Sequence, residues 1–175
     1  MKINMPVTQR EVELEDGDLI VSRTDLKGQI VYVNPDFIRI SGFTEDELIG
    51  QSHNIVRHPD MPVEAFEDLW RDLKNGRPWS GMVKNRCKNG DHYWVEAHVT
   101  PMIENGSVTG YMSIRRKASI AKVKEAEAAY AQFRGGKAGG MQIANGRVRS
   151  SGLVTRLATG LKDMSLATRA ALAAT

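Results

Sequence analysis

Hydrophobic and polar residues alternate in several stretches of the chain, the pattern of strands with one buried face. Near the N-terminus, two short apolar runs, Leu19–Val21 and Ile30–Val33, flank the turn-forming residues Asp25, Lys27 and Gly28. The pattern predicts two strands joined by a turn, so these runs should pair side by side.

Three further strands are predicted in residues 79–116. An Asn-Gly-Asp turn at 89–91 separates the first two, and an Asn-Gly turn within 104–106 separates the last two. Strands joined by such short turns are antiparallel neighbours. Two sets of residues each share one strand face: Trp79, Gly81, Val83, Asn85 and Cys87 on the first strand, and Tyr93, Val95, Ala97 and Val99 on the second.

Helical periodicity fills the interval between the two groups of strands. Pro35 can open a helix that Gly42 ends, and Thr44 with Glu47 forms a capping box for the next. The longest helical pattern covers residues 62–75 and repeats its apolar residues at intervals of three and four. These elements predict an α+β fold: a five-stranded antiparallel sheet with helices packed on one face, leaving room for a pocket between them.

Composition divides the chain into three parts. Residues 1–18 are polar and acidic and are interpreted as an N-terminal arm, residues 19–118 as the main folded domain, and residues 119–175 as a basic, partly helical tail. Within the tail, a helix is predicted up to residue 134, a loosely structured glycine-rich stretch follows, and a second basic helix is predicted from residue 151.

Charge and cysteine content exclude several classes of protein. Residues 1–118 have a net charge of −3 and residues 119–175 one of +6, so the folded part is mildly acidic and nucleic-acid binding is not expected. The single Cys87 excludes an internal disulfide framework and is interpreted as a packed strand residue rather than a redox switch. With no apolar run long enough to span a membrane, a cytoplasmic protein is expected.

The segment SHNIVRHPDMP, residues 52–62, allows three interpretations: a metal site, a catalytic histidine cluster, or the lining of a pocket for an anionic ligand. His53 and His58 are five residues apart, not the three or four that align ligands on one helical face, so a metal is not favoured. No nucleophile–base pair is evident, so an enzyme is not expected. Asp60 is typical of a capped turn, whereas the planar fork of Arg57 suits a phosphate.

Several segments give a more specific indication. Together they resemble the FAD-binding PAS domain of bacterial aerotaxis receptors, the Aer family, over roughly residues 8–118. The resemblance implies a PAS fold and a cytosolic sensor that holds FAD non-covalently, reads redox state, and signals to a HAMP and chemotaxis module. The segments are RHPDMP at 57–62, PWSG at 78–81, VKNRCKNGDHYW at 83–94 and GYMSIR at 110–115.

Trp79 and Asn85 are the strongest candidates for ligand contact. A flat indole on the helix-side face can pack against an isoalloxazine or adenine ring, and Gly81 allows close approach to the backbone. The amide of Asn85 offers a donor and an acceptor, which matches the edge of a flavin. Helix capping remains an alternative for Asn34, and core packing for Tyr111. With the resemblance, the candidate cofactor-binding residues are Asn34, His53, Arg57, His58, Asp60, Trp79, Asn85, Tyr93, His98 and Tyr111.

The favoured hypothesis is redox sensing, in which flavin reduction re-pairs hydrogen bonds on the sheet, for example by rotation of the Asn85 amide. Two alternatives stay open: a cofactor-free module that dimerises through its sheet, and a haem sensor with His53 or His58 as axial ligand. A homodimer and a signalling partner are expected. The basic tail is interpreted as a linker helix, with contact to an anionic membrane surface as the alternative, through Leu153, Val154, Leu157, Leu161 and Leu166.

Overall fold

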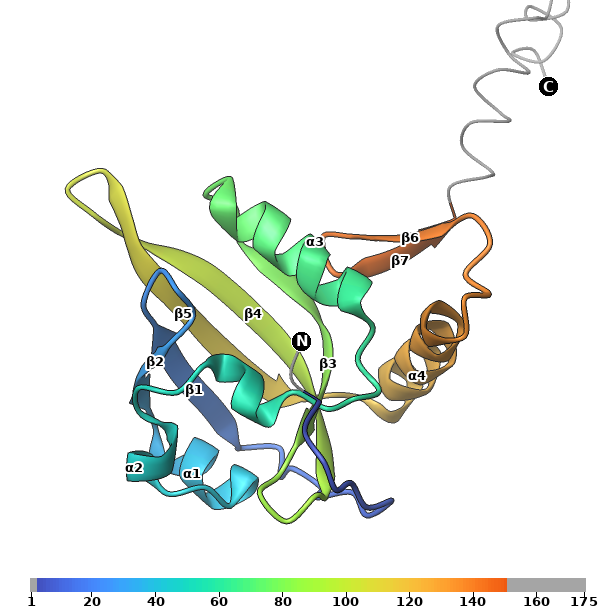
Figure 1. The fold of residues 1–175 in the computed structure, drawn as a ribbon, viewed down its shortest axis with the longest axis horizontal. Coiled ribbons are helices and arrows are strands. Elements are labelled where there is room, and N and C mark those ends of the chain that lie inside the picture. The colour runs from blue at the N-terminus through green and yellow to red at the C-terminus, as the bar shows by residue number, and fades with distance from the viewer. Residues whose placement is uncertain (1–2, 151–175) are drawn as a thin grey trace, which may run out of the picture.

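The computed structural model describes residues 3–150 of the chain. Five strands form one antiparallel sheet in the order β2-β1-β5-β4-β3, as Figure 1 shows. This arrangement confirms the predicted five-stranded antiparallel sheet. The strands are β1 (Leu19–Thr24), β2 (Ile30–Val33), β3 (Trp79–Arg86), β4 (His92–Glu104) and β5 (Ser107–Lys117).

Four helical segments connect β2 to β3 and cover one face of the sheet: α1 (Pro35–Ser41), α2 (Glu45–Leu48), the 3-10 helix η1 (His53–Val56) and α3 (Val63–Lys74). The predicted capping box is present at the start of α2, where Thr44 and Glu47 satisfy each other's backbone N–H groups. Phe37 from α1 and Leu48 from α2 pack against Ile20 and Ile30 of the sheet. This layer leaves the space between α3 and the sheet for the site described below.

Helix α4 (Ile120–Arg134) confirms the helix predicted at the start of the tail, but it packs back on the opposite face of the sheet. Tyr130 stacks on Trp94 with ring centroids 6.3 Å apart, and its hydroxyl donates to the carbonyl of Met82 at 2.8 Å. Phe133 is also buried. The helices between β2 and β3 lie on one face of the sheet as predicted, and the predicted tail helix covers Trp94 of β4 and the backbone of Met82 in β3 on the other face.

The glycine-rich stretch after α4 was predicted to be loosely structured, and that prediction is wrong for its second half. Strands β6 (Met141–Ala144) and β7 (Arg147–Ser150) form a hairpin beside α3. Asn145 and Gly146 have φ values of 50° and 71°, the left-handed conformations that a tight hairpin turn requires. The basic helix and the apolar positions predicted from residue 151 onward lie outside the described residues.

The N-terminal arm is fastened to the domain more firmly than its polar composition suggests. The Asn4 amide donates to the carbonyls of Asn54 and Arg57 at 2.7 and 3.0 Å, and Leu14 is buried. Backbone hydrogen bonds from Thr8 to Gly90 in the β3–β4 turn and from Val12 to His92 at the start of β4 continue this contact. Within residues 3–150, no helix combines the length and the apolar character needed to cross a bilayer.

If α4 is part of the folded domain, removing the Tyr130 ring should destabilise the whole protein. We expect Tyr130→Ala to lower the free energy of unfolding by about 3 kcal/mol through lost packing, and Tyr130→Phe by about 1 kcal/mol through one lost hydrogen bond. Urea unfolding measures both. Gln132→Ala, an exposed position on the same helix, is the control; equal stability of Tyr130→Ala and this control would contradict the packing described.

Candidate functional site

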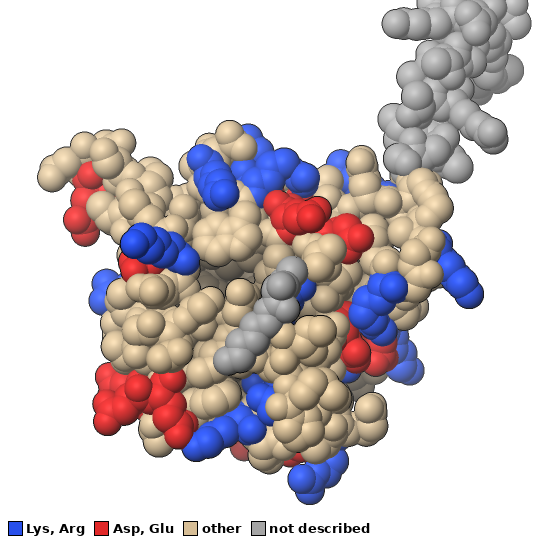
Figure 2. Space-filling view, in the orientation of Figure 1, with Lys and Arg blue, Asp and Glu red and all other residues tan. Residues whose placement is uncertain are grey.

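A cavity of about 100 Å³ lies between the helix-covered face of the sheet and α3. Figure 2 shows the surface hollowed in this region. A mainly apolar wall with a few polar groups is typical of a small-molecule site. The apolar lining comes from Phe66, Leu69, Trp70, Leu73, Trp79, Val83, Ala97, Val99 and Tyr111, and the polar lining from Ser22, Thr24, His53, Asn54, Arg57, Asn85, Ser113 and Arg115, with Gly28 at the β1–β2 turn.

Arg115 places a positive charge in this cavity. Its side chain is 2% exposed and donates to the Ser22 hydroxyl at 2.6 Å and to Nε2 of His53 at 3.2 Å. Within residues 3–150 it forms no ion pair with a carboxylate, and its Nε has no hydrogen-bond partner. Burial lowers the pKa of Arg115 to about 10, so the guanidinium stays charged at neutral pH. A buried cation with only neutral partners is costly, and an anionic ligand would relieve that cost.

His53 is held neutral next to Arg115. Burial, and then the charge of Arg115, lower the pKa of His53 to about 3. Because a guanidinium can only donate, Nε2 of His53 must accept from it. The Ser22 hydroxyl lies 3.1 Å from the same nitrogen. This atom is already engaged, which leaves His53 poorly suited to serve as an axial ligand to a metal.

Asn85 places a buried amide in the cavity lining. The residue is 4% exposed, and its Nδ2 has no hydrogen-bond partner among the described residues. Its backbone bridges to Arg57, which brings the loop after η1 to the end of β3. The Arg57 guanidinium lies over the ring of Phe66, 4.1 Å from its centroid, and burial lowers its pKa. Buried amides are normally paired, so the free Nδ2 of Asn85 fits a ligand acceptor.

Two tryptophans and a tyrosine supply flat surfaces in the lining. Trp79 is 2% exposed and donates its indole N–H to Oδ2 of Asp68 in α3 at 2.7 Å. Trp70 meets Tyr111 edge-on, with ring centroids 5.4 Å apart. The helical period of α3 places its apolar residues Phe66, Leu69, Trp70 and Leu73 in the cavity lining. Planar side chains fixed in this way can pack against a planar ligand.

The structure brings half of the predicted site residues together. His53, Arg57, Trp79, Asn85 and Tyr111 all line the cavity. The other five, Asn34, His58, Asp60, Tyr93 and His98, lie outside its lining.

Asn34 has its whole amide occupied between β1 and α1. Its Oδ1 accepts from the backbone N–H groups of Val21 and Phe37, and its Nδ2 donates to the carbonyl of Leu19 at 2.6 Å. Helix capping, the alternative stated for this residue, is therefore what the structure shows. Tyr93 lies directly opposite Asn85 in the β3–β4 pairing and is fully buried beneath the site.

The remaining three residues lie on the α4 side of the sheet. Asp60 forms an ion pair with Lys84 at 2.7 Å, and His58 meets His92 edge-on with centroids 5.9 Å apart. His98 contacts Ser80 at 2.7 Å on the outer surface. Even-numbered residues of β3 and β4 face this side, whereas Asn85 and Val95 face the cavity.

The sequence interpretation missed the most informative residue of the site. Arg115 follows Tyr111 and Ser113 at period two on β5, and all three line the cavity. The signal was present in the alternation, but the adjacent Arg116 and Lys117 make Arg115 look like one of a solvated basic cluster. Ser22, the hydroxyl partner of Arg115 on β1, was missed because serine is common at strand surfaces.

Residues 30–115 match the family described as the PAS fold, so this part of the chain is a PAS domain. Its relatives place it with the PAS domain of aerotaxis receptors. The sequence is 50% identical over 131 residues to the aerotaxis receptor of Escherichia coli K12, covering 75% of this chain and 26% of that receptor. The predicted family and fold class are confirmed.

Two further comparisons agree with this family. The chain is 27% identical over 113 residues to the nitrogen fixation regulatory protein of Klebsiella pneumoniae, covering 64% of this chain and 23% of that protein. A crystal structure of a PAS domain from Colwellia psychrerythraea has a TM-score of 0.53 and 25% identity, covering 57% of this chain and 86% of that one. The chain thus spans about a quarter of the length of the two full-length relatives.

The neutral state of His53 predicts a pH dependence of stability. With a folded-state pKa near 3 against an ordinary 6.5, the unfolded chain takes up a proton first as the pH falls. Its contribution to the free energy of unfolding is therefore complete above pH 6.5 and is lost as the pH falls toward 3. His53→Gln should reduce the pH dependence of the free energy of unfolding by the contribution of one proton, about 1.4 kcal/mol per pH unit.

Urea unfolding at several pH values between about 7 and 5 measures this slope. His58, whose pKa burial also lowers, contributes equally to both proteins. His98→Gln, at an exposed position on the other side of the sheet, is the matched control. A His53→Gln slope identical to that of this control would show that His53 is not buried as described.

Proposed function

We propose that this chain is the redox-sensing part of an aerotaxis-type signalling protein and that its cavity binds FAD. The observation that carries the proposal is the buried charge of Arg115, without an anionic partner, beside the unpaired amide of Asn85 in an aromatic-lined cavity. Those features call for a ligand that is planar, hydrogen-bonding and anionic or electron-rich. The kinship with aerotaxis receptors supports a flavin, and among flavins we propose FAD.

Different cavity residues would contact the rings and the phosphates of a dinucleotide such as FAD. Trp79 and Trp70 offer flat faces, and Asn85 offers both a donor and an acceptor to a ring edge. Arg115 stands inside the cavity, whereas Arg57 lies at the entrance loop and also borders a surface groove next to Pro59 and Arg134. A phosphate-bearing ligand would therefore meet positive charge both inside and at the opening.

FAD, when bound, supplies a ring that can accept and release electrons together with protons. The protein's part is to register that change through its own hydrogen bonds. The amide of Asn85 can turn over and exchange its donor for its acceptor, and the Ser22 hydroxyl can reorient beside His53 and Arg115. Each re-paired hydrogen bond is worth about 1 kcal/mol, enough to shift a two-state population several-fold.

Asn85, Ser22 and Arg115 lie on β3, β1 and β5 respectively. A change in their hydrogen bonds is therefore transmitted directly to the sheet. In this proposal the sheet passes the signal to a HAMP or chemotaxis module or to a second copy of the chain. The protein acts as a sensor rather than an enzyme, at the cytoplasmic side of the membrane. The length of the relatives supports this view, since about three quarters of each lies outside the matched region.

The two alternatives make different spectroscopic predictions. A haem sensor would need a free histidine in the cavity, but Nε2 of His53 is engaged, and the free Nε2 of His58 belongs to a residue outside the lining. A cofactor-free module would leave the Arg115 charge unneutralised. The absorbance spectrum of the purified protein separates flavin, haem and neither.

We expect the purified chain to bind FAD, with an absorbance that is bleached by dithionite. Arg115→Met should weaken FAD binding at least tenfold, because it removes charge-assisted hydrogen bonds worth about 1.4 kcal/mol or more. Its fold should persist, since replacing a buried charge with an apolar side chain is often neutral. Fluorescence titration measures the affinity, and urea unfolding checks the fold.

Arg116→Met is the matched control for this substitution, because Arg116 is the next residue on β5 and is exposed on the opposite face of the sheet. We expect its affinity for FAD to stay within about twofold of the wild type. A colourless protein that takes up no FAD would refute the proposal. Equal affinities for the two variants would refute the role of Arg115.

A further inference from the structure

We propose that the β6–β7 hairpin is coupled to the cavity through Asp68 and Trp79, so that ligand binding and hairpin docking stabilise each other. This inference rests on the proposed function and assigns a role to a part of the chain that the site does not otherwise use. Asp68 acts here as a positioning residue, because it touches the cavity wall through the Trp79 indole and not the ligand space itself.

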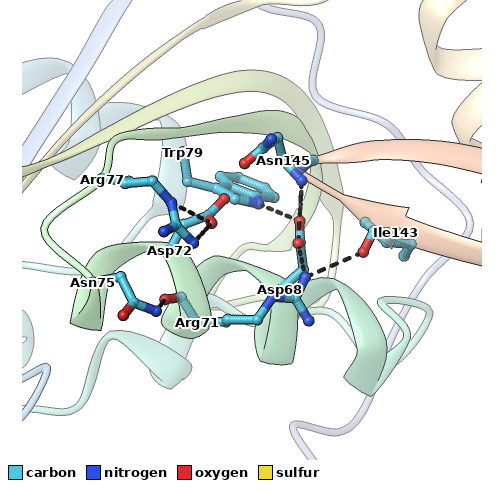
Figure 3. A network of polar contacts seen from close by, with 9 residues as sticks. Asp68, Arg71, Asp72, Asn75, Arg77, Trp79, Ile143 and Asn145 are labelled. Carbon is cyan, nitrogen blue, oxygen red and sulfur yellow. Dashed lines mark hydrogen bonds and ion pairs between the residues drawn. The ribbon is translucent and has the colours of Figure 1, made fainter.

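The Asp68 carboxylate joins three parts of the molecule, as Figure 3 shows. It lies on α3 and is 1% exposed. Its Oδ2 accepts from the indole N–H of Trp79 and from the backbone N–H of Gly146, both at 2.7 Å. Its Oδ1 accepts from the backbone N–H of Asn145 at 3.2 Å and from Arg71. One buried carboxylate thus holds a cavity wall and the hairpin turn at the same time.

The hairpin also touches β3 directly, and the contact leaves no room for a side chain. A Cβ at Gly146 would come within 1.7 Å of the carbonyl oxygen of Ser80 and within 2.8 Å of Cα of Gly81. A Cβ at Gly81 would in turn meet the Trp79 ring at 2.4 Å. The turn of the hairpin, the backbone of β3 and the Trp79 indole are therefore packed as one layer.

This packing makes the coupling mutual. A ligand that packs against Trp79 adds to the contacts that hold the indole N–H on Asp68, and the same carboxylate accepts from the turn of the hairpin. Whatever free energy ligand binding adds to hairpin docking, docking must return to ligand binding. The hairpin leads directly into residue 151, so a change in its docking reaches the chain that follows.

The neighbouring carboxylate shows that this arrangement is specific to Asp68. Asp72 lies one turn further along α3 and is also buried, but it pairs with Arg77 at 2.9 Å. Figure 3 shows this pair beside the Asp68 cluster, and no hydrogen bond links Asp72 to residues 141–150. It therefore provides a control with the same chemistry and a different connection.

Gly146→Ala tests the coupling without altering a cavity residue. The added methyl group should displace the hairpin from β3. Hydrogen–deuterium exchange of the backbone amides at positions 145 and 146 should then become at least tenfold faster, and the affinity for FAD should fall about threefold or more. Gly136→Ala is the matched control. Gly136 has a similar φ of +66°, and a Cβ there meets nothing within 4 Å. We expect it to keep the wild-type affinity and exchange rates.

In the wild type, adding FAD should slow exchange of the same two amides several-fold, as measured by hydrogen–deuterium exchange on the full chain. Asp68→Asn should abolish this response, since an amide nitrogen cannot accept from the donors around it, whereas Asp72→Asn should retain it. These results together would establish the coupling.

The outcomes separate this inference from the proposed function. If the wild type binds no FAD, the proposed function fails and the coupling fails with it. If the wild type binds FAD, but Gly146→Ala releases the hairpin without weakening FAD, the coupling alone is overturned. FAD-dependent protection that persists in Asp68→Asn would overturn the role of Asp68.

Discussion

A guanidinium buried in a sheet raises the free energy of the folded state unless an anion neutralises it. Arg115 lies in the middle of such a sheet, and its partners are a hydroxyl, a neutral imidazole and the face of the Phe37 ring, none of them an anion. The surrounding features follow from that one charge. It adds to the burial that keeps His53 unprotonated, and it donates to the Ser22 hydroxyl of β1.

Trp79 connects the cavity wall to the residues behind it. Its ring forms part of the cavity wall, while its N–H is bound from behind by Asp68. The indole is thus fixed in orientation before any ligand arrives. A pre-positioned aromatic surface binds more tightly than a mobile one, because little side-chain entropy remains to be lost. The hydrogen bond from Asp68 and the packing against Gly81 together provide that rigidity.

Much of this architecture could be predicted from the sequence, because it depends on local patterns. Alternation located the strands, the Thr44–Glu47 capping box located α2, and the helical period located α3. The face of β3 that carries Trp79 and Asn85 was likewise correct.

The errors arose where long-range packing decides the outcome. Asn34 and Asp60 resemble ligand residues in sequence, but they satisfy the backbone of α1 and the side chain of Lys84. Arg115 was hidden among other basic residues, and only the register of β5 against β1 reveals that it faces inward. The β6–β7 hairpin was missed although Asn145-Gly146 is a strong turn signal, because the surrounding glycines suggested a loose chain.

The return of α4 over the outer face has a practical meaning for dividing this protein into parts. The sequence suggests a boundary near residue 118, yet Trp94 and the backbone of Met82 are covered by Tyr130. A fragment cut at that boundary would present an uncovered indole and an unpaired carbonyl to water and would be prone to self-association. The smallest autonomous unit therefore extends past the sheet, and genetic fusions made at residue 118 would separate the PAS domain from part of its own core.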